Sequence, residues 1–188
     1  MRKALAAALA ASLTFALAVP VAAALAPGAK APDFTTRGAT AGKIFTLHLA
    51  DALKKGPVVL YFFPAAFTPG CSAEARAFAA AINDFNKAGA QVIGMSADPV
   101  SVLADFSKKE CAGQFAVASA GPAVVKGYDV ALGRELVGKD GQSRAISNRT
   151  SYVIAPSGEV IYVHSDSNPA DHVRNTLEAV RRYRSTRG

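Results

Sequence analysis

The 188-residue sequence has few residues of the types that bind metals or form redox pairs: two cysteines, Cys71 and Cys111, and three histidines. The cysteines do not form a Cys-x-x-Cys pair, which disfavours a redox protein that works through two neighbouring thiols. The histidines lack metal-ligand spacing, and two cysteines without partner histidines do not make a zinc site. The sequence therefore predicts no metal site.

No apolar run is long enough for a membrane-spanning helix, which needs about 20 residues. The apolar run from Ala4 to Val19 is Ala-rich and ends at Pro20, and Arg2 and Lys3 precede it. Small residues follow up to Ala24, as at a signal-peptidase cleavage site. We therefore expect residues 1–24 to be a cleaved signal peptide, and the mature chain to be exported, to the bacterial periplasm or outside the cell, without stable membrane association.

The sequence has fewer acidic than basic residues: 14 Asp and Glu against 21 Lys and Arg, which gives a formal net charge of +7. Loss of Arg2 and Lys3 leaves 19 against 14, or +5. The densest basic cluster lies at the end of the last expected helix, where cations complement the helix dipole and face water. We therefore expect no nucleic-acid partner. The cluster consists of Arg174, Arg181, Arg182, Arg184 and Arg187.

The mature chain shows no internal repeat and is expected to form one domain, residues 43–188, preceded by an extended Pro- and Gly-rich arm, residues 25–42. Apolar patterning predicts strands at 44–49, 57–63, 90–96 and 114–118, helices at 72–87, 99–110, 122–128 and 169–183, and a hairpin of strands 150–155 and 159–164. This order predicts an α/β fold with a mixed sheet.

The most informative segment runs from Phe62 to Glu74, where an apolar strand stops at a Pro/Gly turn and a helix starts at Cys71. A helix N-terminus presents unpaired N–H groups and the positive end of the dipole, which favour a thiolate. Cys71 is therefore the candidate nucleophile. The alternative is a static disulfide to Cys111, because disulfides persist in an oxidising compartment.

The pattern Pro64-x-x-x-Thr68-x-x-Cys71-x-x-Glu74 resembles the active-site loop of the peroxiredoxins, in particular the bacterioferritin comigratory protein or PrxQ branch of the AhpC/TSA group. The segment from Asn148 to Gly158 is similar to the arginine-bearing strand and turn of that family. The resemblance covers essentially the whole mature chain. It implies a thioredoxin-like fold with a mixed central sheet flanked by helices.

The resemblance also implies site roles. Cys71 would be the peroxidatic cysteine, which attacks the terminal oxygen of a hydroperoxide and becomes a sulfenic acid. Pro64 would shield the thiolate from water, and Thr68 would exchange hydrogen bonds with thiolate and peroxide. Arg149 would stabilise the thiolate and the leaving oxygen, and Glu74 would hold Arg149. The chemistry agrees, because a thiolate needs nearby positive potential and arginine stays charged.

The second cysteine departs from one pattern of this branch. Many PrxQ members carry the resolving cysteine five residues after the peroxidatic one, where this chain has Arg76. Other members place it on the helix after the next strand, where Cys111 lies. Cys111 is thus the expected resolving residue, forming an intramolecular disulfide with Cys71. If Cys111 is inert, the enzyme works with one cysteine and an external thiol.

The predicted function is that of a cofactor-free thiol peroxidase that reduces hydrogen peroxide and organic hydroperoxides. A thioredoxin-like or other thiol reductant would regenerate it, and the protein would be a monomer or homodimer. Two other functions stay open: a non-catalytic thioredoxin-fold module with a permanent Cys71–Cys111 bridge, and a redox sensor whose oxidised form binds a partner.

Overall fold

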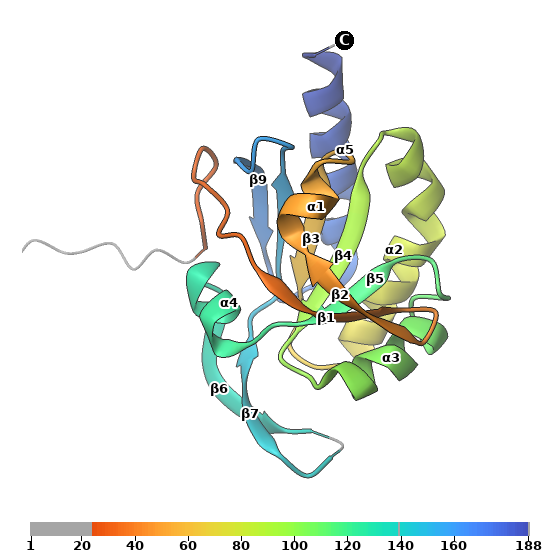
Figure 1. Cartoon of the computed structure of the whole chain (residues 1–188), viewed down its shortest axis with the longest axis vertical. Coiled ribbons are helices and arrows are strands. Elements are labelled where there is room, and N and C mark those ends of the chain that lie inside the picture. Colours follow the sequence, from red (N-terminus) through yellow and green to blue (C-terminus); the bar gives the residue numbers. More distant parts are fainter. Residues whose placement is uncertain (1–23, 139, 188) are drawn as a thin grey trace, which may run out of the picture.

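Figure 1 shows the computed structural model of the chain, which describes residues 24–138 and 140–187. The expected signal peptide lies almost entirely outside the described residues, so it stays a prediction. Within the described ranges, no helix combines the length and the apolar character needed to cross a membrane. The strands are β1 (Thr35–Thr40), β2 (Lys43–His48), β3 (Val58–Phe62), β4 (Gln91–Ser96), β5 (Ala116–Ser119), β6 (Ala131–Val137), β7 (Ser143–Ser147), β8 (Thr150–Ile154) and β9 (Val160–Ser165). The helices are α1 (Leu49–Leu53), α2 (Pro69–Lys87), α3 (Val100–Lys109), α4 (Pro122–Gly127), the 3-10 turn η1 (Pro169–Asp171) and α5 (His172–Ser185).

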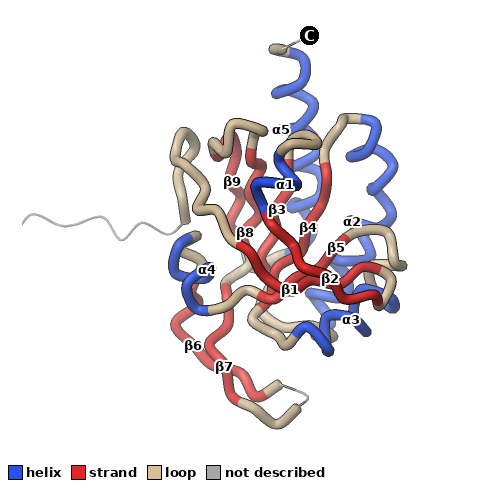
Figure 2. The backbone as a smooth tube through the Cα atoms, in the orientation of Figure 1, coloured by secondary structure: helices blue, strands red, loops and turns tan. Residues whose placement is uncertain are grey.

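A seven-stranded mixed sheet in the order β2-β1-β5-β4-β3-β8-β9 forms the centre of the fold (Figure 2). Strands β3, β4 and β5 are parallel to one another, and β8 pairs antiparallel with β3. Phe62 at the end of β3 faces Thr150 at the start of β8. The turn after β3 and the residue before β8 therefore meet at the same edge of the sheet, and the predicted mixed sheet is confirmed.

Strand β3 is buried along its whole length, which explains its continuous apolar sequence. Its side chains alternate between two apolar clusters. Val59 and Tyr61 belong to the cluster that includes residues of α2, α3 and α5, whereas Val58 and Leu60 belong to the cluster that includes residues of α1 and α4. Both cysteines lie in the first cluster, so the candidate thiols sit on the α2 side of the sheet.

The structure differs from the expected elements at strand β1, at helix α1 and at the β6–β7 hairpin. Helix α1 has only five residues, which is too short for helical periodicity to show in the sequence. Residues 35–40, expected in an extended arm, form β1 inside the sheet and pair with β2 and β5. Small residues and threonines give this strand no clear alternation. The hairpin of β6 and β7 was not expected either, because most residues of β6 face solvent and carry no apolar pattern.

Candidate active site

The loop after β3 is held in place by polar contacts from three other segments. The Phe63 amide donates to the Met95 carbonyl at 2.9 Å, and the Ser147 hydroxyl donates to the Phe63 carbonyl at 3.1 Å. The Ala66 amide donates to Oδ2 of Asp98 at 2.7 Å. These contacts fix the backbone that leads to the candidate nucleophile.

Asp98 is the buried acceptor that ties this loop to β4 and β7. Besides the Ala66 amide, it accepts a hydrogen bond from the Ser96 hydroxyl at 2.8 Å, and its Oδ1 lies 3.5 Å from an Arg144 nitrogen. A buried carboxylate is tolerated only with such partners. No sequence pattern indicates this role of Asp98, because most of its partners come close to it only in the folded chain.

Cys71 lies in the first turn of α2, which begins at Pro69. Proline suits the first helical position because its missing N–H would have no helical partner there. Thr68 precedes the helix in an extended conformation, and its hydroxyl donates to the Ala65 carbonyl at 2.9 Å. The Cys71 side chain is almost completely buried, so its sulfur lies within the field of the helix N-terminus.

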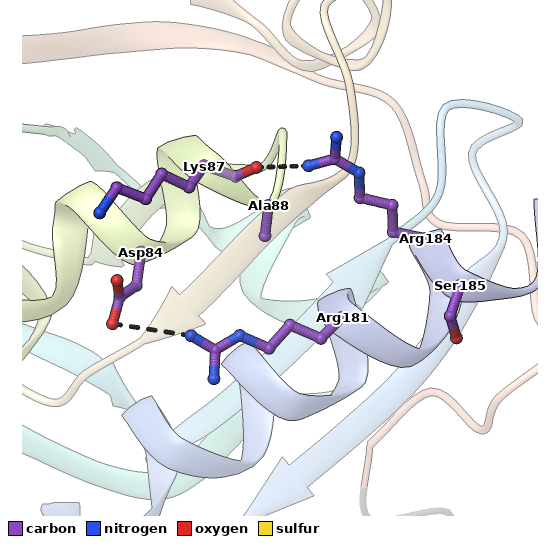
Figure 3. Close-up of a pocket in the computed structure, with 6 residues that line it drawn as sticks. All are labelled: Asp84, Lys87, Ala88, Arg181, Arg184 and Ser185. Atoms are coloured by element: carbon purple, nitrogen blue, oxygen red, sulfur yellow. Dashed lines mark hydrogen bonds and ion pairs between the residues drawn. The ribbon is translucent and has the colours of Figure 1, made fainter. Parts of the chain in front are cut away.

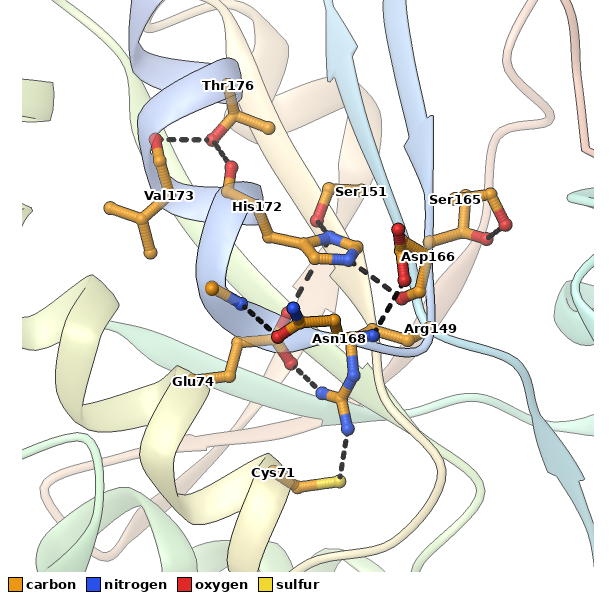
Figure 4. Close-up of polar contacts among 12 residues, drawn as sticks. Cys71, Glu74, Arg149, Ser151, Ser165, Asp166, Asn168, His172, Val173 and Thr176 are labelled. Carbon is orange, nitrogen blue, oxygen red and sulfur yellow. Dashed lines mark hydrogen bonds and ion pairs between the residues drawn. The ribbon is translucent and has the colours of Figure 1, made fainter.

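Arg149, directly before β8, joins the candidate residues (Figure 4). Its Nη2 donates to the Cys71 sulfur at 3.5 Å, its Nη1 is ion-paired with Glu74, and its Nε donates to the Ser167 carbonyl at 3.0 Å. A Cβ at Gly70 would lie only 3.4 Å from Nη2, so glycine leaves room for the guanidinium. Burial opposes the charge, yet the Glu74 and Cys71 charges outweigh it and raise the pKa of Arg149.

Glu74 follows Cys71 by one helical turn and is fully buried. Burial raises its pKa from 4.5 to about 7, although the contact with Arg149 acts in the opposite direction. Only Oε2 contacts the guanidinium. The other oxygen, Oε1, has no hydrogen-bond partner among the described residues.

His172, the first residue of α5, lies next to Glu74. Its Nδ1 lies 2.8 Å from the Ser151 hydroxyl and 3.7 Å from Glu74 Oε1, and its Nε2 lies 3.0 Å from the Asp166 carbonyl. Burial lowers the pKa of His172 to about 4, so at neutral pH the imidazole is uncharged and the 3.7 Å approach is not an ion pair. His172 was not among the predicted site residues, because the histidines of the sequence show no metal-ligand spacing.

Cys111 lies in the turn after α3 and is fully buried in the same apolar cluster as Cys71, and both thiols are free. Burial raises the pKa of the Cys111 thiol well above its usual range. Its neighbour Glu110 is ion-paired with Arg76 of α2. The structure thus places Cys71, Glu74 and Arg149 in direct contact, places Thr68 and the half-buried Pro64 in the adjoining loop, and places Cys111 on a separate segment.

A cavity of about 300 Å³ lies beside this loop and is lined by residues 65–68, Val102 and the β6–β7 hairpin, including Leu136 and Ile146. A larger cavity of about 490 Å³ lies between the C-terminal ends of α2 and α5 (Figure 3). None of the candidate residues lines the larger cavity, where Arg181 and Arg184 join α5 to α2. The smaller cavity therefore has the better position for a substrate.

The opposite shifts at Glu74 and His172 make a prediction about stability. Between about pH 4.5 and 6.5 the folded pair holds its proton on Glu74, whereas the unfolded chain holds one on His172, so the two contributions cancel. In Glu74→Gln only the histidine titrates. As pH falls, His172 takes up its proton in the unfolded chain before it does so in the folded chain. The free energy of unfolding should therefore fall by about 3 kcal/mol as pH drops from about 6.5 to about 4.

Urea unfolding of the wild type and of Glu74→Gln at a series of pH values measures this difference. The exposed Glu178→Gln serves as the control, since a surface carboxyl should leave the wild-type pH dependence in place. Curves of the same shape for Glu74→Gln and the wild type would contradict the assignment of buried protonation states.

Comparison with known proteins agrees with this geometry. Residues 27–163 match the model of the AhpC/TSA family. Peroxiredoxin Q of rice chloroplasts (Oryza sativa subsp. japonica) is 34% identical over 80% of this chain, and the match spans 64% of the rice protein. Peroxiredoxin Bcp of Xanthomonas campestris is 31% identical over 66% of this chain and 76% of its own length.

Solved structures show the same fold. Peroxidoxin BcpB from Mycobacterium tuberculosis superimposes with a TM-score of 0.71 at 29% identity, over 83% of this chain and 96% of that one. Xanthomonas campestris peroxiredoxin Q gives a TM-score of 0.65 at 27% identity, over 79% and 90%. The expected thioredoxin-like fold is thus confirmed, and the chain belongs to the AhpC/TSA family of peroxiredoxins.

Proposed function

We propose that this chain is a thiol peroxidase in which Cys71 reduces hydroperoxides. The observation that carries the proposal is the 3.5 Å contact between the Cys71 sulfur and the guanidinium of Arg149, at the first turn of a helix. Helix dipole and guanidinium both favour the thiolate, which is the nucleophilic form of cysteine. The thiolate attacks the terminal oxygen of the peroxide, the S–O bond forms as the O–O bond breaks, and alkoxide or hydroxide leaves and takes up a proton.

The loop residues support the same chemistry. The Thr68 hydroxyl already donates to the Ala65 carbonyl, so its lone pairs remain to accept a hydrogen bond from the peroxide. Arg149 stabilises the negative charge that develops on the leaving oxygen. Half-buried Pro64, directly after Phe63, limits the access of water to the pocket. The apolar lining of the cavity beside Thr68 suits organic hydroperoxides as well as hydrogen peroxide.

We further propose that Cys111 resolves the Cys71 sulfenic acid. Its thiol attacks the oxidised sulfur, an S–S bond forms and water leaves. In the structure Cys111 is buried and its pKa is raised, so this step requires the turn at 110–113 to open. That turn contains two residues with positive φ, Ala112 and Gly113. Its opening must break the hydrogen bonds from the Glu110 and Cys111 amides to the Phe106 carbonyl and from the Gly113 amide to the Ser107 carbonyl. A small thiol protein of the thioredoxin type would then reduce the disulfide.

Intact mass and free-thiol counts before and after one equivalent of hydrogen peroxide test the cycle. We expect both thiols to disappear and the mass to fall by about two units, because a disulfide forms. Cys71→Ser controls for methionine oxidation. Gain of one oxygen on Cys71 alone would replace the resolving step by an external thiol, and unreactive thiols would leave a non-catalytic module.

Arg149→Ala should slow the oxidation of Cys71 by about 10²- to 10³-fold, because one donor to a developing anion has an effect of this size. Arg149→Lys should recover little, since one ammonium cannot contact Glu74, Ser167 and the sulfur together. Stopped-flow peroxide kinetics measure both variants. A rate equal to that of the wild type in Arg149→Ala would contradict charge stabilisation by this residue.

We also propose that the protein is exported, from the basic start, apolar run and small residues before Leu25. The test is expression of the full chain in a bacterium, followed by fractionation and N-terminal sequencing of the product. A product that begins near Leu25 and occurs outside the cytoplasm is expected. A full-length cytoplasmic product would contradict export.

A further inference from the structure

The second carboxylate oxygen of Glu74 faces a histidine nitrogen and no hydrogen-bond donor among the described residues. Oε2 contacts Arg149, whereas Oε1 has no hydrogen-bond partner among the described residues and lies 3.7 Å from His172 Nδ1 (Figure 4). Both side chains are fully buried. A buried, unpartnered carboxylate oxygen is costly, so its surroundings indicate what completes it.

The tautomer of His172 follows from its partners. The Asp166 carbonyl can only accept, so Nε2 carries the hydrogen, and Nδ1 presents a lone pair. The Ser151 hydroxyl donates to this lone pair and can rotate its hydrogen away. No hydrogen therefore points at Glu74 Oε1 while the carboxyl is ionised. A proton on Oε1 creates a donor opposite an acceptor.

Arg149 contacts two groups that can be anions, the Cys71 sulfur and the Glu74 carboxyl. Two like charges that share one buried site disfavour each other, so the second group keeps its proton. One guanidinium therefore carries at most one full anion at a time, and the thiolate forms only once Glu74 is protonated.

We propose that Glu74 and His172 together hold the proton that Cys71 gives up, with His172 as a positioning residue that acts through Glu74. The proposal rests on the function proposed above, in which Cys71 is the reacting thiol. Its proton passes to solvent as another binds Oε1. The new O–H faces Nδ1, which accepts it once the two side chains close the 3.7 Å gap to hydrogen-bond distance. Arg149 keeps its hydrogen bond to Oε2 and directs its charge to the sulfur.

The same pair, Glu74 and His172, also balances the protons of the peroxide reaction. When the thiolate attacks hydrogen peroxide, a neutral sulfenic acid forms and hydroxide leaves. Arg149 then faces no anion at sulfur, so Glu74 loses its proton to solvent, and hydroxide takes up one proton. The sum is a thiolate and a carboxylic acid converted to a sulfenic acid and a carboxylate, with no net change in bound protons.

The groups around the pair agree with a proton on Glu74. Burial, together with the nearby His164 and Arg149, lowers the pKa of His172 to about 4, although Asp166 acts in the opposite direction. Burial raises the pKa of Glu74 to about 7. The buried Tyr61 phenol lies within the field of both Cys71 and Glu74, and its own pKa is raised, so it stays neutral.

The first experiment measures protons during oxidation. The reduced protein in weak buffer with a pH indicator, at about pH 8, is mixed with one equivalent of hydrogen peroxide. At this pH Glu74 beside a neutral sulfur is mostly ionised. Thiolate is counted from its ultraviolet absorbance, with Cys71→Ser as blank. The wild type should show thiolate and almost no proton uptake, whereas Glu74→Gln, which cannot titrate, should take up one proton per thiolate. Disulfide formation releases only water, so it leaves the count unchanged.

The second experiment separates His172 from a simple anchor of the loop at Asp166. His172→Gln can reach the Asp166 carbonyl but has no acceptor at the Nδ1 position, whereas His172→Asn offers an acceptor near Nδ1 and loses the Asp166 contact. We expect His172→Gln to lose thiolate or to take up about one proton per thiolate. His172→Asn should stay close to the wild type. A structural anchor predicts the reverse order.

Three results would overturn the proposal: a wild type without thiolate at this pH, one proton taken up per wild-type thiolate, or His172→Gln that matches the wild type while His172→Asn does not. Each of these results is obtained while Cys71 still reacts with peroxide. Failure of the proposed function is different, because Cys71 would then not be oxidised in any variant.

Discussion

The buried guanidinium of Arg149 is the interaction on which the arrangement of this site depends. Its three partners come from two segments that are far apart in the chain: Glu74 and Cys71 from the start of α2, and the Ser167 carbonyl from the loop after β9. A buried cation that loses one such partner destabilises the fold by several kcal/mol. Sheet register must therefore place Arg149 at the end of β3, and the pairing of Phe62 with Thr150 does so.

A small number of contacts also fixes the position of Cys71. Strand β3 is buried on both faces, and its end is fixed by Met95, Ser147 and Asp98, so the short loop to α2 has little freedom. The sulfur then lies between a helix N-terminus and a cation, in an apolar surrounding that strengthens both fields. Both the fixed loop and the nearby positive charge are needed, because a mobile thiol would not keep its 3.5 Å contact with Arg149.

Sequence patterns predicted the elements whose signals lie within one short segment of the chain. The run from Phe62 to Glu74 carries its own strand, turn and helix signals, and the β8–β9 hairpin is marked by its turn. Cys71 was predicted from its place at the start of a helix after a Pro/Gly turn, whereas Glu74 and Arg149 were identified through the resemblance to a family motif. Asp98, Ser151 and His172 were missed, because each acts only through partners distant in the chain. Residues 35–40 were predicted to lie in an extended arm because their composition shows no strand pattern. Their pairing with β5, which is distant in the sequence, makes them a strand of the sheet.

Arg76 stands where many PrxQ relatives are expected to carry a cysteine, and its ion pair with Glu110 connects the first turns of α2 to the turn that holds Cys111. In the proposed cycle the turn that holds Cys111 opens, and this ion pair is one contact that restrains it. The Arg76 side chain is 59% exposed, so dissolved ions compete for this contact. In that cycle, the ionic strength of the medium would affect how long an oxidised Cys71 persists before Cys111 reaches it, and so how long a second peroxide has to react.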